Sequence, residues 1–188
     1  MKFIEKSNGL YITGIEIEDL AWRNLGGRVD SDDPGARPSH YIDLKVRDTN
    51  LLEYLLEQGV TVKDAPDYKN PDVINHVVRF KAYPKVKENP ITHKTEHVPK
   101  VMIRVESTDT TRRLSIEEFR EADRIKASNI SIRFHIYRSE YHGVHIIPSI
   151  DEYWCSVDEF TNDHEDYLSD LYGSNQDPNE GVDDVPFV

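Results

Sequence analysis

The sequence contains a single cysteine, Cys155, among 188 residues. One cysteine excludes an internal disulfide framework and a cysteine-based zinc site, and it suits a reducing cytoplasm. No hydrophobic run approaches the roughly 18 residues that a membrane-spanning helix needs. Lys2 and Glu5 place charges inside the first apolar stretch, which argues against a signal peptide. We therefore expect a cytoplasmic protein that makes no membrane contact.

Signatures of catalysis and of cofactor binding are also missing. The sequence has no phosphate-binding loop, no serine nucleophile elbow and no dinucleotide-binding glycine pattern. His93 and His97 are four residues apart in a proline-bounded segment, and His142 with His145 lacks a carboxylate at zinc-protease spacing. We predict no enzymatic activity, no metal and no cofactor. A metal-dependent hydrolase or nuclease stays the third hypothesis.

Positive charge is absent from the last fifty residues. Residues 1–138 hold 23 basic and 22 acidic side chains, whereas residues 139–188 hold 13 acidic side chains and no lysine or arginine. The net charge of −12 therefore comes from residues 139–188, whereas residues 1–138, the body of the protein, are nearly neutral. A near-neutral body with an acidic tail suits a nucleic-acid-binding protein whose tail covers the cationic site or recruits partners, although acidic tails also serve solubility alone.

Alternation of apolar and polar residues predicts a mostly antiparallel β domain. A helix is expected over 50–58, with Asn50 as N-cap and Gly59 in the left-handed conformation beyond its end. Ser115 and Glu118 fit a capping box that opens a second helix to about Ile125. Loops are expected over 24–38, 64–72 and 84–99. Strands are expected over 10–17, 40–47, 73–83, 100–106 and 129–137, with one or two more in 143–157.

These elements predict an all-β fold with short helices. A five-stranded antiparallel barrel of the oligonucleotide-binding (OB) type fits best, and a β-sandwich is the competitor. We place the domain at residues 1–160 and an acidic C-terminal tail at residues 161–188. Residues 158–172 could form a short amphipathic helix, and disorder is expected at least from residue 173, where the chain has almost nothing apolar to bury.

Four predicted strands set an aliphatic face against a face that mixes cations with tyrosines. Proteins that bind single strands without sequence preference need this mixture, because cations neutralise phosphates and aromatic rings stack on any base. Solvent faces of ordinary sheets hold the same residue types, but four such strands in one chain favour nucleic acid. The predicted contacts on these strands are Tyr41, Lys45, Arg47, Arg79, Lys81, Tyr83, Arg104, Arg133 and Tyr137.

Two further segments extend the predicted DNA-binding surface. Trp22 and Arg23 open a glycine loop, where the tryptophan could stack on a base or equally plug one end of the barrel. Arg28 in the same loop can reach phosphates. The most cationic stretch of the chain, residues 84–100, follows directly from the Arg79 strand and contributes Lys85 and Lys100.

Several short motifs occur in a characteristic order: Trp22-Arg23-Asn24-Leu25-Gly26-Gly27, then segments 55–63, 77–83, 98–101, 114–118, 130–137 and 142–144. This order resembles the OB-fold single-stranded-DNA-binding proteins of tailed bacteriophages over about residues 10–160. The sequence departs from that pattern in an insertion at 84–97 and in Val60, where such proteins often have tryptophan.

The resemblance implies binding of single-stranded DNA without sequence preference during phage replication, recombination or repair, in the cytoplasm of a bacterial host. It also implies that an acidic tail ending near an aromatic residue recruits replication or recombination proteins. Asp183, Asp184 and Phe187 fit such a tail, although Val188 is the last residue. The alternative is a protein–protein adaptor or DNA mimic whose acidic surface is the working site. Monomer and dimer both stay open.

Overall fold

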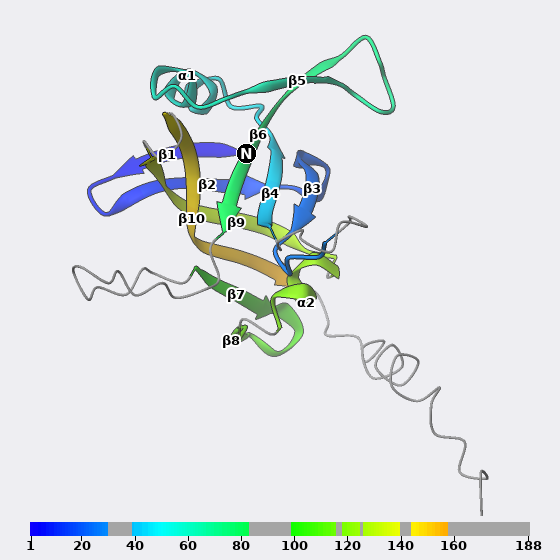
Figure 1. Cartoon of the computed structure of the whole chain (residues 1–188). Coiled ribbons are helices and arrows are strands. Elements are labelled where there is room, and N and C mark those ends of the chain that lie inside the picture. Colours follow the sequence, from blue (N-terminus) through cyan, green and yellow to red (C-terminus); the bar gives the residue numbers. More distant parts are fainter. Residues whose placement is uncertain (30–38, 83–98, 116–117, 125, 140–143, 158–188) are drawn as a thin grey trace, which may run out of the picture. The chain divides into compact units, whose positions relative to one another are not determined.

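Ten strands and two short α-helices make up the described part of the computed structural model, which comprises residues 1–29, 39–82, 99–115, 118–124, 126–139 and 144–157 (Figure 1). In chain order the elements are β1 (Lys2–Lys6), β2 (Gly9–Ile15), η1 (Ile17–Asp19), β3 (Leu20–Asn24), β4 (His40–Lys45), α1 (Thr49–Glu57), β5 (Lys63–Pro66), β6 (Ile74–Ala82), β7 (Lys100–Val105), η2 (Glu106–Thr108), β8 (Thr110–Arg113), α2 (Phe119–Arg124), β9 (Ser128–Ser139) and β10 (His145–Val157).

All of these strands belong to one sheet, with the order β1-β2-β9-β10-β6-β4-β3. β5 pairs with β6, and the β7-β8 hairpin joins the sheet through β10. Among the described residues β1 and β3 do not pair with each other, so the sheet does not close. The predicted all-β class with short helices is confirmed and is consistent with an OB-like fold. The sheet has more strands than the five expected.

Strand β10 organises the sheet because it changes neighbours along its length. Its first half lies parallel to β6 at the pair Ser149 and Lys81, and its second half lies parallel to β7 from Glu152 to Val157. Strand β9 runs antiparallel beside both halves. The register with β9 shifts between Ile150 and Glu152 and again between Trp154 and Ser156, and Figure 1 shows that β10 is bent along its length. A bulge of this kind increases the local bend and redirects side chains.

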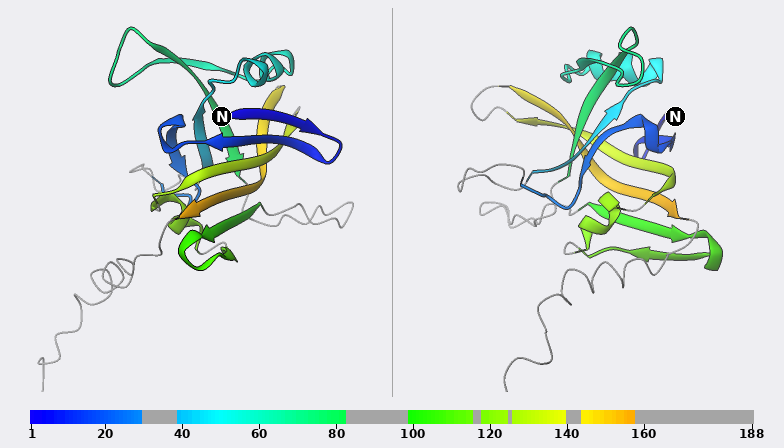
Figure 2. Two further views of the ribbon diagram at one scale, coloured as in Figure 1. Left: turned by 180° about the vertical axis from the view of Figure 1, so that it is seen from behind. Right: turned by 90° about the vertical axis from the view of Figure 1, so that its right-hand side faces the viewer.

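The hydrophobic core lies on one side of the sheet, as the alternation predicts. Phe80 and Phe134 meet edge to face with ring centroids 5.2 Å apart, and Ile42, Leu44 and Ile132 are almost fully buried beside them. Helix α1 and strand β5 lie at one end of the sheet, and α2 with the β7-β8 hairpin lies at the other (Figures 1 and 2). The side chains that point away from the core are thereby left on a separate surface.

The ends of α1 match the sequence in part. Gly59 has a φ of +80°, which confirms the expected left-handed position after the helix. The N-cap is Asp48 and not Asn50, because the Asp48 carboxylate accepts hydrogen bonds from the amides of Leu51 and, across the fold, Phe3, both at 3.0 Å. Burial alone would raise the pKa of Asp48, but these backbone hydrogen bonds outweigh it and lower the pKa.

Helix α2 begins at Phe119, later than predicted. The Glu118 carboxylate accepts a hydrogen bond from the Ser115 amide at 2.9 Å, which is one half of the expected capping box. The predicted end at residue 125 lies outside the described residues. Four short strands, β1, β3, β5 and β8, had no counterpart among the predicted strands, since each has at most five residues and little apolar alternation.

Candidate nucleic-acid interface

The strand registers place most of the predicted contact residues on one surface, opposite the core. Paired residues on neighbouring strands point to the same side of a sheet. On β3, β4 and β6, Trp22 pairs with Asp43, Asp43 pairs with Arg79, and Tyr41 pairs with Lys81. Lys81 in turn pairs with Ser149 of β10. Further along β10, Glu152 pairs with Arg133 of β9 and with Lys100 of β7. We call this surface the outer face. Its members used below are Trp22, Tyr41, Asp43, Lys45, Arg79, Lys81, Lys100, Arg104, Arg133, His135, Tyr137, Glu152 and Trp154.

At one end of the outer face, Arg79 lies on the ring of Tyr41. Its guanidinium carbon is 3.6 Å from the ring centroid. Its Nε and Nη2 each donate to one oxygen of Asp43 at 2.7 Å, which is a bidentate pair. Hydrogen bonding to Asp43 raises the pKa of Arg79 and outweighs the opposing effect of burial. Arg79 is therefore held in place on the surface and in turn supports the Tyr41 ring.

The glycine loop after β3 separates the residues that sequence reasoning grouped together. Trp22 is exposed, with 47% of its surface accessible, and Arg28 lies 5.9 Å from its ring centroid. Arg23 instead turns toward α2 and donates from Nη1 to the Ala122 carbonyl at 2.9 Å. The structure thus brings Trp22 and Arg28 together at the edge of the outer face. Arg23 instead connects this part of the chain to α2.

Carboxylates accompany most of the predicted cations, which the sequence analysis did not foresee. Lys45 lies 3.6 Å from Asp67, Arg47 3.1 Å from Asp19, and Arg104 2.7 Å from Asp109. The acids of these pairs lie outside the strands, Asp19 in η1 and Asp67 and Asp109 in connecting segments, so strand alternation gives no signal for them. Lys81 differs, since it makes no ion pair with any residue that the structure describes. The outer face is therefore less positive than its arginines and lysines suggest.

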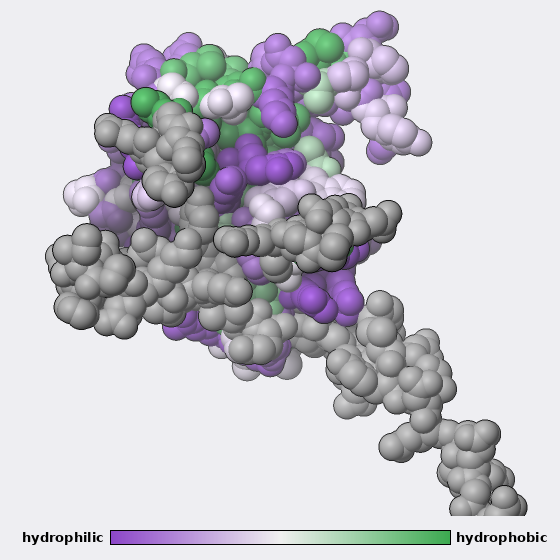
Figure 3. Space-filling model, viewed as in Figure 1, coloured by the Kyte–Doolittle hydropathy of each residue, from purple (hydrophilic) through white to green (hydrophobic). Residues whose placement is uncertain are grey.

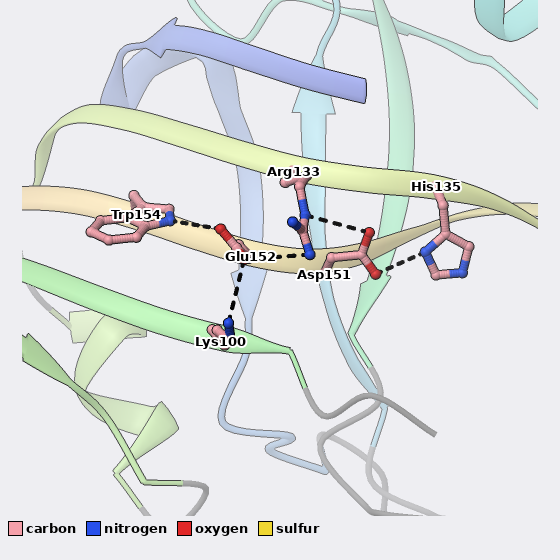
Figure 4. A network of polar contacts seen from close by, with 6 residues as sticks. All are labelled: Lys100, Arg133, His135, Asp151, Glu152 and Trp154. Carbon is pink, nitrogen blue, oxygen red and sulfur yellow. Dashed lines mark hydrogen bonds and ion pairs between the residues drawn. The ribbon is translucent and has the colours of Figure 1, made fainter. Parts of the chain in front are cut away.

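A network of polar contacts lies where β9, β10 and β7 run side by side (Figure 4). The bulge in β10 turns both Asp151 and Glu152 toward Arg133, at 3.9 and 3.3 Å. Glu152 also lies 3.7 Å from the Lys100 ammonium, and it accepts a hydrogen bond from the Trp154 indole nitrogen at 3.3 Å. His135 contacts Asp151 at 2.9 Å, and this hydrogen bond raises the pKa of His135 despite partial burial.

Trp154 is the main residue of the outer face that the sequence analysis missed. It is 39% exposed and lies in register with Met102 on β7 and Ser131 on β9. Its neighbours Tyr153 and Cys155 point into the core, and burial raises the pKa of the Cys155 thiol to about 11. The sequence signal that could have identified Trp154 as outward-facing is its period-two phase with the polar residues Glu152 and Ser156, opposite Tyr153 and Cys155.

A groove of about 290 Å³ lies beside Lys81, where β6 and the start of β10 diverge under α1. Figure 3 shows hydrophobic surface next to hydrophilic surface in this region. The lining combines apolar side chains, mainly from Val60 and the start of β10, with charged groups of β4, β5 and β6. The lining includes Val60, Lys63, Val77, Arg79, Lys81, Val144, Ile146 and Pro148.

The remaining predicted contacts fall in two groups. Tyr137 is 45% exposed near the end of β9, on the same side as His135 and Arg133. Tyr83 and Lys85 lie outside the described residues, as do Asp183, Asp184 and Phe187 of the predicted partner-binding tail.

Metal and membrane sites can be assessed over the same residues. Within the described ranges no group of three or more histidine, cysteine, aspartate or glutamate side chains could hold a metal ion. Neither of the two α-helices in the part of the chain that the structure describes has the length and apolar character of a membrane span.

No protein-family model matches this chain, and no curated protein matches its sequence. Among solved structures, the chain is similar to the single-stranded DNA-binding protein from bacteriophage Enc34 in complex with ssDNA, with a TM-score of 0.47 and 13% identity over 83% of this chain and 94% of that chain. A C-terminal truncation of that protein gives a TM-score of 0.46 and 12% identity over 85% and 97% of the two chains.

Proposed function

We propose that this protein binds single-stranded DNA without sequence preference, through the outer face. The observation that carries the proposal is the interleaving of accessible rings with cations on strands whose registers join them. Trp22 and Tyr41 lie near Arg28 and Arg79, and Trp154 lies near Lys100 and Arg133. Rings stack on any base and cations attract the backbone, so this surface suits a strand of any sequence.

The paired carboxylates determine how strongly salt should affect binding. Each phosphate contact lowers the logarithm of affinity by about 0.7 per logarithmic unit of salt. Because carboxylates already accompany Lys45, Arg47 and Arg104, we expect only about two to four net phosphate contacts, and hence a slope of roughly −1.4 to −2.8. Stacking should then supply most of the affinity that persists at high salt.

Intrinsic fluorescence provides the measurement, since the chain has two tryptophans and both lie on the outer face. Titration with a thymidine oligonucleotide at several salt concentrations should quench the emission, with preference for single strands over a matched duplex. Equal binding of duplex, or a flat response to salt, would contradict the proposal.

The paired carboxylates also favour a second candidate function, a protein–protein adaptor or DNA mimic. A surface in which acids sit beside most cations could receive a partner protein. The same titration separates the two candidates, because an adaptor should show no quenching with the oligonucleotide. Aromatic rings and arginines are also common in protein interfaces. We retain DNA binding as the first candidate because rings and cations recur together along several neighbouring strands, which suits the alternating bases and phosphates of one extended strand.

We further propose that the protein acts in phage DNA replication, recombination or repair, and that its acidic C-terminal residues recruit other proteins of that process. Asp183, Asp184 and Phe187 place one aromatic anchor beside two negative charges, which suits a pocket with a basic rim. Pull-downs from phage-infected cells should lose partner proteins when residues 173–188 are deleted. Recovery of the same partners by the truncated chain would refute recruitment by the tail.

A further inference from the structure

Glu152 occupies the centre of the polar network on the outer face. One of its oxygens faces both cations, at 3.3 Å from Arg133 Nη2 and 3.7 Å from Lys100 Nζ. The other oxygen accepts from the Trp154 indole at 3.3 Å. Two cations and an N–H group therefore converge on one acidic side chain from three strands (Figure 4). The same three donors would suit the oxygens of a phosphate group.

The contacts of Glu152 are long compared with a well-formed ion pair. Charge-assisted N–H···O bonds are about 2.7–2.9 Å, and the bidentate contacts of Arg79 with Asp43 reach 2.7 Å. All three contacts of Glu152 exceed that range. Arg133 Nε is moreover buried without a hydrogen-bond partner among the described residues. Exchange of Glu152 for another anion therefore costs less than breaking the Arg79 pair, and it can satisfy donors that Glu152 satisfies poorly.

We propose that Lys100, Arg133 and Trp154 form a binding site for one phosphate group, and that Glu152 fills this site in the DNA-free protein. The inference rests on the proposed function, because the phosphate it names belongs to the backbone of single-stranded DNA. On binding, the phosphate takes the place of the Glu152 carboxylate, which turns toward solvent. Asp151 keeps its contacts with His135 and Arg133, so a carboxylate remains beside Arg133 after the exchange.

The site also fixes where an adjoining base would lie. The Trp154 ring is part of the outer face, and its N–H end points at Glu152. A phosphate held by Lys100 and Arg133 therefore lies beside the edge of this ring, and the neighbouring base can stack on its exposed surface. Glu152 thus competes with the DNA phosphate at a position where the cations neutralise the phosphate and Trp154 stacks on the adjoining base.

The test compares wild-type protein with Glu152→Gln, which preserves side-chain size and removes the competing charge. Binding of a thymidine oligonucleotide at low salt should tighten by about threefold to tenfold, since the neutral amide of this variant no longer repels the incoming phosphate. Glu53→Gln on the exposed side of α1 is the matched control for net charge, and it should change the affinity by less than about twofold. Thermal unfolding of both variants checks that the fold is retained.

A double-mutant cycle separates this site from a general charge effect. Lys100→Gln should weaken DNA binding more in the Glu152→Gln background than in wild-type protein, because Glu152 then no longer masks the ammonium. Additive effects, or unchanged affinity of Glu152→Gln, would overturn the phosphate site while wild-type binding leaves the proposed function standing. If neither wild-type protein nor Glu152→Gln binds the oligonucleotide, the proposed function itself fails. Competition by inorganic phosphate alone, without any effect of Glu152→Gln on DNA, would show that the site takes free anions and would also overturn the proposal.

Discussion

Trp154→Ala is expected to weaken binding of single-stranded DNA by about 1–3 kcal/mol, which corresponds to roughly 5-fold to 150-fold in affinity. The reason is the loss of an exposed ring that lies among Lys100, Arg104 and Arg133 on the outer face. Alanine removes the stacking surface and also the indole N–H that faces Glu152. Stability should change little, because the side chain points away from the core.

Quenching of Trp22 can report on binding in this variant, since it is the second tryptophan of the chain. Trp154→Phe separates the two contributions of the side chain. Phenylalanine keeps a ring and should recover most of the affinity, whereas the N–H group is lost in both variants. If Trp154→Ala binds DNA with normal affinity, Trp154 does not contact the DNA. If its melting temperature drops strongly, Trp154 contributes to folding and not to binding.

The sequence predicts the faces of the long strands because alternation in them is regular. Ile42 and Leu44 of β4, Val78 and Phe80 of β6, and Ile132 of β9 are all buried as expected, and their neighbours point outward. The pattern succeeds where a strand has a continuous aliphatic side. It fails for β1, β3, β5 and β8, which are held by pairing with longer strands and carry little hydrophobic signal of their own.

The bulge in β10 is the feature that strand alternation could not have predicted. Two successive residues of a regular strand point to opposite faces, which would direct either Asp151 or Glu152 into the core. The register shift between Ile150 and Glu152 lets both carboxylates reach Arg133. Pro148 lies two residues before Ile150, and Asp151 and Glu152 are two successive polar residues. Both suggest an irregular strand, but neither says which carboxylates reach Arg133. The acidic side of the candidate site was missed for this reason.

The contact that Arg23 makes in the structure could not be predicted from its neighbours in the sequence. Its neighbour Trp22 is exposed, and a cation next to an aromatic residue suggested a shared contact with DNA. The backbone of α2, far along the chain, accepts its hydrogen bond through the Ala122 carbonyl. Contacts of this range depend on how separate elements pack, and residue spacing within one segment carries no information about them.

Asp123→Ala is expected to destabilise the fold by about 2–5 kcal/mol, through the loss of two hydrogen bonds in a partly buried setting. The Asp123 carboxylate of α2 accepts from the amides of Leu25 and Gly26 at 2.8 and 2.7 Å. Burial raises the pKa of Asp123, and these two amides with Arg23 oppose that rise. Alanine would leave both amides without their acceptor and would remove the negative charge near Arg23.

The close packing of the loop on α2 makes recovery by rearrangement unfavourable. A Cβ atom at Gly26 would lie 2.3 Å from Arg120 Cγ and 2.8 Å from its Cα, so the loop backbone rests directly on the helix. Asp123 therefore fixes the loop after β3, which carries Arg28 and adjoins Trp22 at the edge of the outer face. We expect Asp123→Ala to lower DNA affinity as well as stability, because these two residues lose their fixed positions.

Denaturant unfolding measures the first effect, and oligonucleotide titration well below the melting temperature measures the second. Asp72→Ala, at an exposed position, is the matched control and should stay within about 0.5 kcal/mol of wild type. Asp123→Asn should lie between alanine and wild type, since one amide oxygen can accept from one backbone N–H while the amide NH2 group faces the other. Wild-type stability of Asp123→Ala would show that the loop does not depend on this carboxylate, and loss of stability with intact DNA affinity would remove Trp22 and Arg28 from the binding surface.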